Sequence, residues 1–103
     1  MSIYSTLAST GLPCVYSHFK PVDGQRPTIP YIAYLGSGQT TFKADDTIYW
    51  KENEYQVEYY FTEKNEELEE EIESALLNAG YIYEKSEDVY IENEGVFVIY
   101  YYI

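Results

Sequence analysis

Hydrophobic and polar residues repeat with two different periods along the chain, which predicts both strands and helices. A period of two, typical of strands with one buried face, is clearest in residues 55–61, where every second residue is aromatic or valine. Apolar runs predict the other strands at residues 15–19, 31–35, 47–51, 81–85 and 95–103. The polar residues 52–54 fit the short turn of a hairpin between two of these strands.

Two helices are expected to cover this sheet. Ser2 is a suitable N-cap for a short helix that ends near Thr10, and Asn65 for a longer helix that ends at Gly80. Apolar residues of the longer helix recur at helical spacing and form one stripe: Leu68, Ile72, Ala75, Leu76 and Ala79. Burial of a leucine or isoleucine contributes on the order of 1.5–3 kcal/mol, so this stripe should pack on the sheet.

These elements predict one domain over residues 1–103 of the α+β class: a mixed, mainly antiparallel sheet with two helices packed on one face. The last strand, within residues 95–103, shows no clear polar alternation. We therefore expect it to lie inside the sheet, with one face under the helices and the other against a partner.

The charge and the aromatic content limit the partners. Six basic and 18 acidic residues give a net charge of -12, which disfavours DNA and anionic membranes as ligands because phosphates are bound by lysine and arginine. No secretory signal pattern and no apolar run of roughly 20 residues is present, so we expect a soluble cytoplasmic product without membrane contact. The 14 tyrosines favour surfaces that are buried against a partner part of the time.

The run GSGQTT, which begins at Gly36, has the glycines with which a phosphate-binding loop lets backbone N–H groups approach an anion. The rest of that mechanism is missing. No lysine lies between Gly36 and Lys43, an extended pattern follows in place of a helix, and Asp45 and Asp46 would repel a phosphate. We therefore expect residues 36–46 to be a long loop between strands.

The sequence contains no convincing catalytic or metal-binding constellation. In a strand, at about 3.3 Å per residue, the only cysteine, Cys14, and the only histidine, His18, would lie roughly 13 Å apart, too far to act as nucleophile and base. A single cysteine also forms no internal disulfide, which fits a reducing compartment. Asp45 and Asp46 lack the spacing of a calcium loop. We expect no enzymatic activity, no cofactor and no metal.

Glutamates crowd the start of the second helix. On a helix, Glu66, Glu70 and Glu73 would form one row with neighbours about 6 Å apart along the axis, close to the phosphate spacing of a DNA strand. Three interpretations remain open: a solvated face that favours the helix dipole, a mimic of DNA toward a basic enzyme, and a negative wall past which DNA slides without sticking.

The order of these features resembles the small tail terminator proteins of long-tailed phages, a group of head-tail joining and tail completion proteins also found in prophages. The resemblance spans about Gly11 to Ile103 and is carried by GLPCVYSHF, PYIAY, ADDTIYW and above all YQVEYYFTEKNEELEEEIESALLNAG. The tyrosine-rich strand that leads through Lys64 and Asn65 into the amphipathic helix is its most specific part.

The resemblance implies a structural virion protein that forms a ring, usually of six subunits, at the head-proximal end of the tail tube. Such a ring ends tube growth and forms the head-docking surface. Its implied partners are copies of itself, the tail tube protein and the head connector protein, and DNA passes through the centre without specific binding. Assembly would take place in the host cytoplasm, with the row of glutamates at the lumen or surface. Docking would fall to the expected loop: Gly36, Ser37, Gly38, Gln39, Thr40, Thr41, Phe42 and Lys43.

The net charge of the subunits opposes their assembly into a ring. Subunits that each carry a charge of -12 repel one another, so we expect weak self-association that salt or divalent cations strengthen. The alternative function is an acidic inhibitor that mimics DNA, acts as a monomer or dimer, and binds a basic nucleic-acid-binding enzyme through Glu66, Glu70 and Glu73.

Overall fold

The computed structural model describes residues 2–16, 28–44 and 47–103. Within these residues it contains two helices and six strands. In chain order they are α1 (Ile3–Ala8), β1 (Cys14–Tyr16), β2 (Tyr31–Ala44), β3 (Thr47–Phe61), α2 (Glu66–Asn78), β4 (Glu84–Lys85), β5 (Val89–Ile91) and β6 (Val96–Tyr102).

The strands form one mixed sheet. Its order is β1-β2-β3-β6-β4, and β5 also pairs with β6. β1 runs parallel to β2, whereas the other pairs are antiparallel. In register, Ala33 of β2 lies opposite Val15 on one side and Glu58 on the other. The predicted α+β class with a mixed, mainly antiparallel sheet is confirmed.

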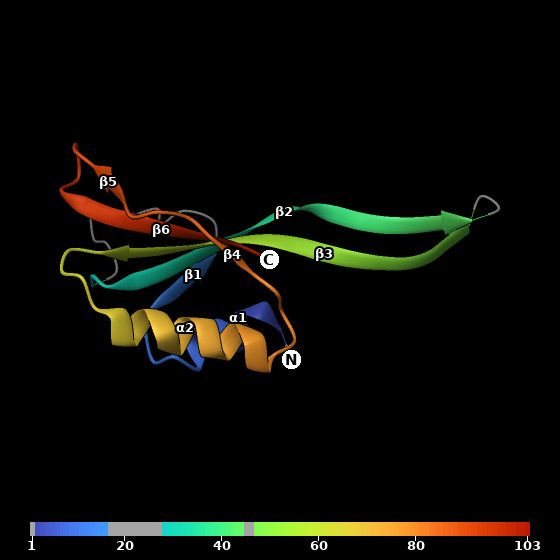
Figure 1. Cartoon of the computed structure of the whole chain (residues 1–103), viewed down its shortest axis with the longest axis horizontal. Helices are drawn as coiled ribbons and strands as arrows, with labels where there is room; N and C mark the ends of the chain where they lie inside the picture. Colours follow the sequence, from blue (N-terminus) through green and yellow to red (C-terminus); the bar gives the residue numbers. More distant parts are fainter. Residues whose placement is uncertain (1, 17–27, 45–46) are drawn as a thin grey trace.

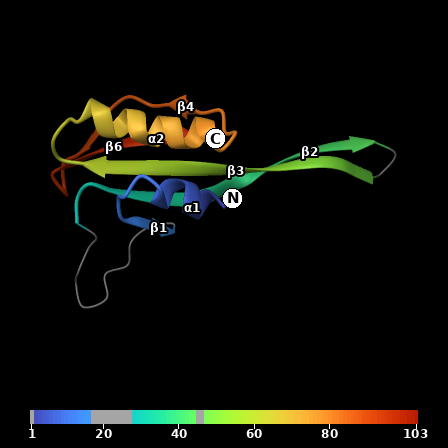
Figure 2. The ribbon, with the colours of Figure 1, turned by 90° about the horizontal axis from the view of Figure 1, so that it is seen from below.

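Both helices cover the same face of the sheet (Figures 1 and 2). α2 begins where the sequence predicts, because the Asn65 side chain accepts a hydrogen bond from the Leu68 N–H at 3.2 Å. It ends at Asn78, and Gly80 follows the C-cap with a φ of 92°, which lets the Tyr81 N–H donate to the Leu76 carbonyl at 2.9 Å.

The core lies between the helices and the sheet. Alternate residues of the central strands meet one stripe of each helix there, as the two periods predict. The buried cluster comprises Ile3, Leu7, Ile32, Val57, Tyr59, Phe61, Ile72, Leu76, Ile99 and Tyr101. Leu68 packs at its margin. The predicted stripe of α2 is therefore the cover of this core.

The prediction of a loop at residues 36–46 and of a turn at residues 52–54 is wrong. β2 continues to Ala44, and β3 runs without interruption from Thr47 to Phe61. The two strands pair along this whole length, with Gln39 opposite Asn53 and Phe42 opposite Trp50. Two strands can pair through their backbones without alternating apolar residues when neither face has to be buried. The polar sequence of this ribbon therefore gave no strand signal.

The C-terminal part departs from the prediction in detail. β4 covers only residues 84–85 of the strand expected at residues 81–85. β5 was not predicted, because it lies in a segment rich in acidic residues. β6 lies between β3 and the edge strands β4 and β5, so its predicted position inside the sheet is confirmed. β1 covers residues 14–16 of the first expected strand, and residues 17–19 lie outside the described ranges.

Candidate functional site

A two-stranded ribbon, called the hairpin arm, projects from the rest of the sheet (Figure 1). It consists of residues 36–44 of β2 and 47–54 of β3. Among the described residues, β1 pairs with β2 only as far as Tyr34, and the ladder between β6 and β3 begins at Gln56. Eight residues at about 3.3 Å each give the arm a reach of roughly 26 Å. Within residues 2–16, 28–44 and 47–103, no third strand pairs with this ribbon.

The pairing of the two strands is irregular at the base of the arm. The register shifts between Gly36 and Gly38, and Gly38 has a φ of 134°, a conformation that favours glycine. Beyond this irregularity the Gln39 amide donates a hydrogen bond to the Asn53 side chain at 2.7 Å. These features explain why two glycines and several polar residues, which resemble a loop in sequence, form paired strand.

The outer part of the arm, residues 40–44 and 47–51, is called the arm tip. Its backbone register places Phe42 opposite Trp50, Lys51 opposite Thr41 and Lys43 opposite Ile48. Residues 40–51 contain two lysines and two aspartates, so this segment has no net charge in a chain of charge -12. In the backbone register, two aromatic positions thus lie opposite each other, and each is followed in sequence by a lysine, in a neutral segment of an acidic protein.

The structure places all eight predicted docking residues on one strand of the arm: Gly36, Ser37, Gly38, Gln39, Thr40, Thr41, Phe42 and Lys43. Sequence reasoning missed the residues that pair with them, among them Ile48, Trp50 and Lys51. The sequence did predict a strand at residues 47–51, but it predicted that this strand pairs with residues 55–61 and not with residues 40–44.

The three glutamates of the predicted acidic row differ in their exposure to solvent. Glu66 and Glu70 are exposed, but Glu73 is turned toward the sheet. Its carboxylate accepts hydrogen bonds from the hydroxyls of Tyr101 at 2.8 Å and Tyr83 at 3.1 Å, and it lies 2.9 Å from Lys85 Nζ. Burial opposes ionisation, but the hydrogen bonds from Lys85 and Tyr101 hold the pKa of Glu73 below its ordinary value. Two carboxylates of the row, not three, face solvent freely.

Next to Glu73 lies a buried carboxylate that the sequence analysis missed. Glu69 is only 2% exposed, and its oxygens lie 2.8 Å from Lys64 Nζ and 2.9 Å from Lys85 Nζ. Lys64 also pairs with Asp88 at 3.1 Å. Glu69 could have been found, since it lies three residues before Ile72, on the buried stripe of α2.

We call this group the lysine–carboxylate cluster: Lys64, Glu69, Glu73, Lys85 and Asp88. Although burial opposes it, hydrogen bonds to Glu69 and Glu73 raise the pKa of Lys85, so its charge is kept. The cluster joins α2 to the strand β4 and to the segment before β5. Each of the three carboxylates lies next to one of the two lysines, so the cluster links these segments of the fold by ion pairs.

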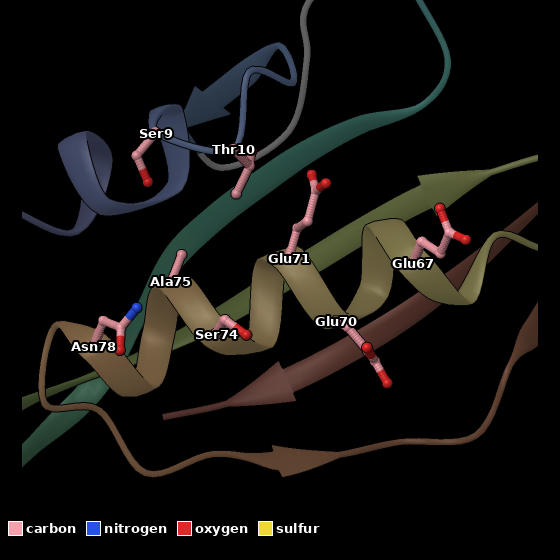
Figure 3. Close-up of a pocket in the computed structure, with 8 residues that line it drawn as sticks. All are labelled: Ser9, Thr10, Glu67, Glu70, Glu71, Ser74, Ala75 and Asn78. Atoms are coloured by element: carbon pink, nitrogen blue, oxygen red, sulfur yellow. The ribbon is translucent and has the colours of Figure 1, made fainter.

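A shallow groove of about 460 Å³ lies along α2 on the side of α1 (Figure 3). Glu71 and Ala75 point toward α1 there, whereas Glu70 points to the opposite side of the helix. The groove is lined by Ser9, Thr10, Glu67, Glu70, Glu71, Ser74, Ala75 and Asn78. Small side chains thus form much of its surface, and its charged groups are carboxylates.

Catalytic chemistry has little support in the described residues. Burial raises the pKa of the Cys14 thiol to about 11, so the nucleophilic thiolate is scarce at neutral pH. His18 lies outside the described ranges. Within residues 2–16, 28–44 and 47–103, no three histidine, cysteine or acidic side chains are grouped so that they could hold a metal ion.

The tyrosines give a pH-dependent prediction. Burial raises the pKa of several tyrosines above the ordinary value of 10.0, and hydrogen bonds to Glu58 and Glu73 add to this at Tyr60 and Tyr101. The others are Tyr34, Tyr59, Tyr81, Tyr83 and Tyr100. A raised pKa means that the folded state holds the phenol proton more tightly, so stability is kept below pH 10 and lost as the pH rises above it.

We therefore expect the free energy of unfolding to fall steeply above about pH 10. Tyrosinate absorbance should rise in two phases, and the second should coincide with loss of the folded circular dichroism signal. The urea-unfolded chain, titrated in parallel, should give a single phase at the ordinary pKa. A folded chain whose 14 tyrosines all ionise together near that value would contradict the assigned burial.

The fold and the arm define the class of protein: a small α+β domain with a projecting two-stranded arm and an acidic helix layer. No known protein-family model matches the chain, and no curated protein shows significant similarity to it. No helix among the described residues is both long and apolar enough to cross a membrane.

Proposed function

We propose that this protein is a structural assembly protein of a phage or prophage tail, the terminator that caps the head-proximal end of the tail tube. Copies of the chain form a ring of six subunits, which ends tube growth and provides the head-docking surface. The tail tube protein and the head connector protein are its partners. The protein has no catalytic role. Its place is the virion tail, and it assembles in the host cytoplasm.

The hairpin arm is the observation that supports this proposal most strongly. A two-stranded hairpin by itself is marginally stable in water. An arm that pairs with no third strand among the described residues gains stability when it lies on another surface, so it suits an assembly element.

The acidic surface suits the passage of DNA. Glu66, Glu70 and their neighbours on α2 are exposed, and phosphates are repelled by carboxylates. A ring whose lumen carries such a surface lets DNA through without holding it. The DNA-mimic alternative has weaker support, because Glu73, the third carboxylate of its row, is engaged by Lys85 and Tyr101.

A shortened arm tests the assembly role. Residues 40–52 are replaced by Asn-Gly, which closes a two-residue turn between Gln39 and Asn53, a paired position. The body should still fold, since the arm projects away from the helices that cover the core (Figure 1). Light scattering and electron microscopy should find closed rings for the wild-type chain, most readily with salt or magnesium, and only monomers for the shortened chain.

The same measurements can contradict the proposal. A wild-type chain that forms no ring at any concentration, with or without magnesium, is not a self-assembling terminator. Rings that form equally well without the arm would remove the observation on which the proposal rests. Circular dichroism of the shortened chain separates loss of assembly from loss of folding.

A further inference from the structure

The face of the sheet opposite the helices carries a group of tyrosines around one carboxylate. Tyr59 and Tyr101 belong to the core beneath the helices, so the residues next to them in β3 and β6 point to the opposite face. Among the described residues, no helix lies on this second face (Figures 1 and 2). We call the group the tyrosine–carboxylate patch: Tyr31, Gln56, Glu58, Tyr60, Tyr100 and Tyr102.

Glu58 lies at the centre of this patch and is held from both sides. The Tyr60 hydroxyl donates a hydrogen bond to Glu58 Oε1 at 2.6 Å, and the Gln56 amide donates one to Oε2 at 2.9 Å. The register places Tyr100 opposite Glu58 on β6 and the small residue Ala33 opposite it on β2. Because each carboxylate oxygen has a second acceptor position, Glu58 is an oriented acceptor for a further group with two N–H donors.

The aromatic rings beside Glu58 are ordered by stacking. Tyr60 stacks on Tyr31 with ring centres 4.9 Å apart, and Tyr100 stacks on Tyr102 at 6.3 Å. Tyr60 and Tyr100 are half-buried and Tyr102 is 45% exposed, so solvent reaches the patch. Burial and the hydrogen bond to Glu58 raise the pKa of Tyr60, and burial and the charge of Glu58 raise the pKa of Tyr100. Both phenols are therefore neutral at pH 7, and neutral rings attract a cation to their faces.

The charge of Glu58 is not paired among the side chains that the structure describes. Lys64 and Lys85, the lysines of this part of the chain, are both bound to Glu69 in the lysine–carboxylate cluster. The side chains of the other basic residues are not described: Lys20, Arg26, Lys43 and Lys51. A half-buried carboxylate in a chain of charge -12 is stabilised by a cation that a partner supplies.

We propose that the tyrosine–carboxylate patch binds an arginine side chain of a basic partner protein. The guanidinium donates two N–H bonds to Glu58 and lies against the rings of Tyr60 and Tyr100. Arginine fits this patch better than lysine, because its planar fork matches the two carboxylate oxygens and its plane stacks on aromatic rings. The net charge of the chain attracts such a partner. This inference goes beyond the proposed function and does not depend on it, since it assigns no role to the hairpin arm.

Three short peptides test this proposal on the full chain. The first is acetyl-Gly-Arg-Gly-amide, and the other two replace its arginine with lysine or with citrulline, which has nearly the same shape without the charge. A single side chain makes few contacts, so we expect a dissociation constant roughly in the millimolar range for the arginine peptide. It should bind at least about tenfold more tightly than the citrulline peptide and about threefold more tightly than the lysine peptide. Amide chemical shifts measured by NMR should locate it at Glu58 and Tyr100.

Variants of the chain show whether Glu58 itself binds the arginine. Glu58→Gln keeps the shape but removes the charge, so the affinity for the arginine peptide should fall at least about tenfold, to that of the citrulline peptide. Tyr100→Leu removes a ring beside the guanidinium and should weaken binding about threefold. The matched control is Glu92→Gln, which removes the same charge at an exposed position in the turn after β5 and should change the affinity less than about twofold. Circular dichroism confirms that each variant is folded.

Three outcomes would contradict the proposal. Equal losses of affinity in Glu58→Gln and Glu92→Gln would show that only the net charge attracts the peptide. Equal affinities for the arginine and lysine peptides would show that the patch does not recognise a guanidinium. If the wild-type chain binds no peptide but an Arg26→Gln variant does, the patch is filled by the arginine of the chain itself and not by a partner.

Discussion

The Ile72→Asp variant is expected to abolish soluble folding. Ile72 is fully buried in the cluster between α2 and the sheet. Loss of its side chain alone would cost about 2–5 kcal/mol, and the buried carboxylate adds a desolvation penalty of several kcal/mol more. A domain of this size has a total stability of roughly 5–15 kcal/mol, so little or none would remain.

The matched control is Leu77→Asp, an equivalent change on the same helix at a side chain that is 54% exposed. It should change the free energy of unfolding by no more than about 0.5 kcal/mol. Circular dichroism and urea unfolding of the two variants check the prediction. A cooperatively unfolding Ile72→Asp protein would show that α2 does not cover the core as described.

Removal of both lysines around Glu69 is expected to have the second-largest effect. The Lys64→Met/Lys85→Met variant leaves a carboxylate that is 2% exposed without either of its cations. Breaking a buried ion pair in this way costs on the order of 3–5 kcal/mol, because an uncompensated charge stays buried. Methionine preserves most of the side-chain volume, so the loss reports on charge rather than on packing. Urea unfolding at neutral pH measures it.

The arm supplies the control for this experiment as well. Lys43→Met/Lys51→Met changes the net charge by the same amount, on a segment that projects away from the helices and the core beneath them (Figure 1). Its stability should stay close to that of the wild-type chain. Equal losses in the two double variants would show that overall charge, and not the cluster around Glu69, controls the stability.

The helix layer could be predicted because its signals are local. Asn65 at the start of α2, a stripe that includes Ile72, and Gly80 after its end are all within a single run of the chain. Each acts through backbone geometry or through one helix face. The strand before it was equally clear, because its alternate residues face the core and so carry the period of two.

The arm and the lysine–carboxylate cluster could not be predicted in the same way. Residues 36–44 and 47–54 project beyond the helices that cover the sheet (Figure 1), so no apolar face is imposed on them, and their glycines and polar residues resemble a loop. Glu69 and Lys85 are 16 residues apart, and their contact exists only because β4 is placed beside α2. A contact between two residues so far apart produces no periodic pattern in the sequence.

The sequence by itself therefore determined the class of fold, the two helices and the buried face of the sheet, because burial of apolar area imposes a period that can be read along the chain. The tertiary structure alone decided which strands pair, that residues 36–44 and 47–54 form a projecting arm, and that Glu69 is buried between two lysines. These features depend on backbone pairing and on contacts between distant segments, which carry no local pattern of hydrophobicity.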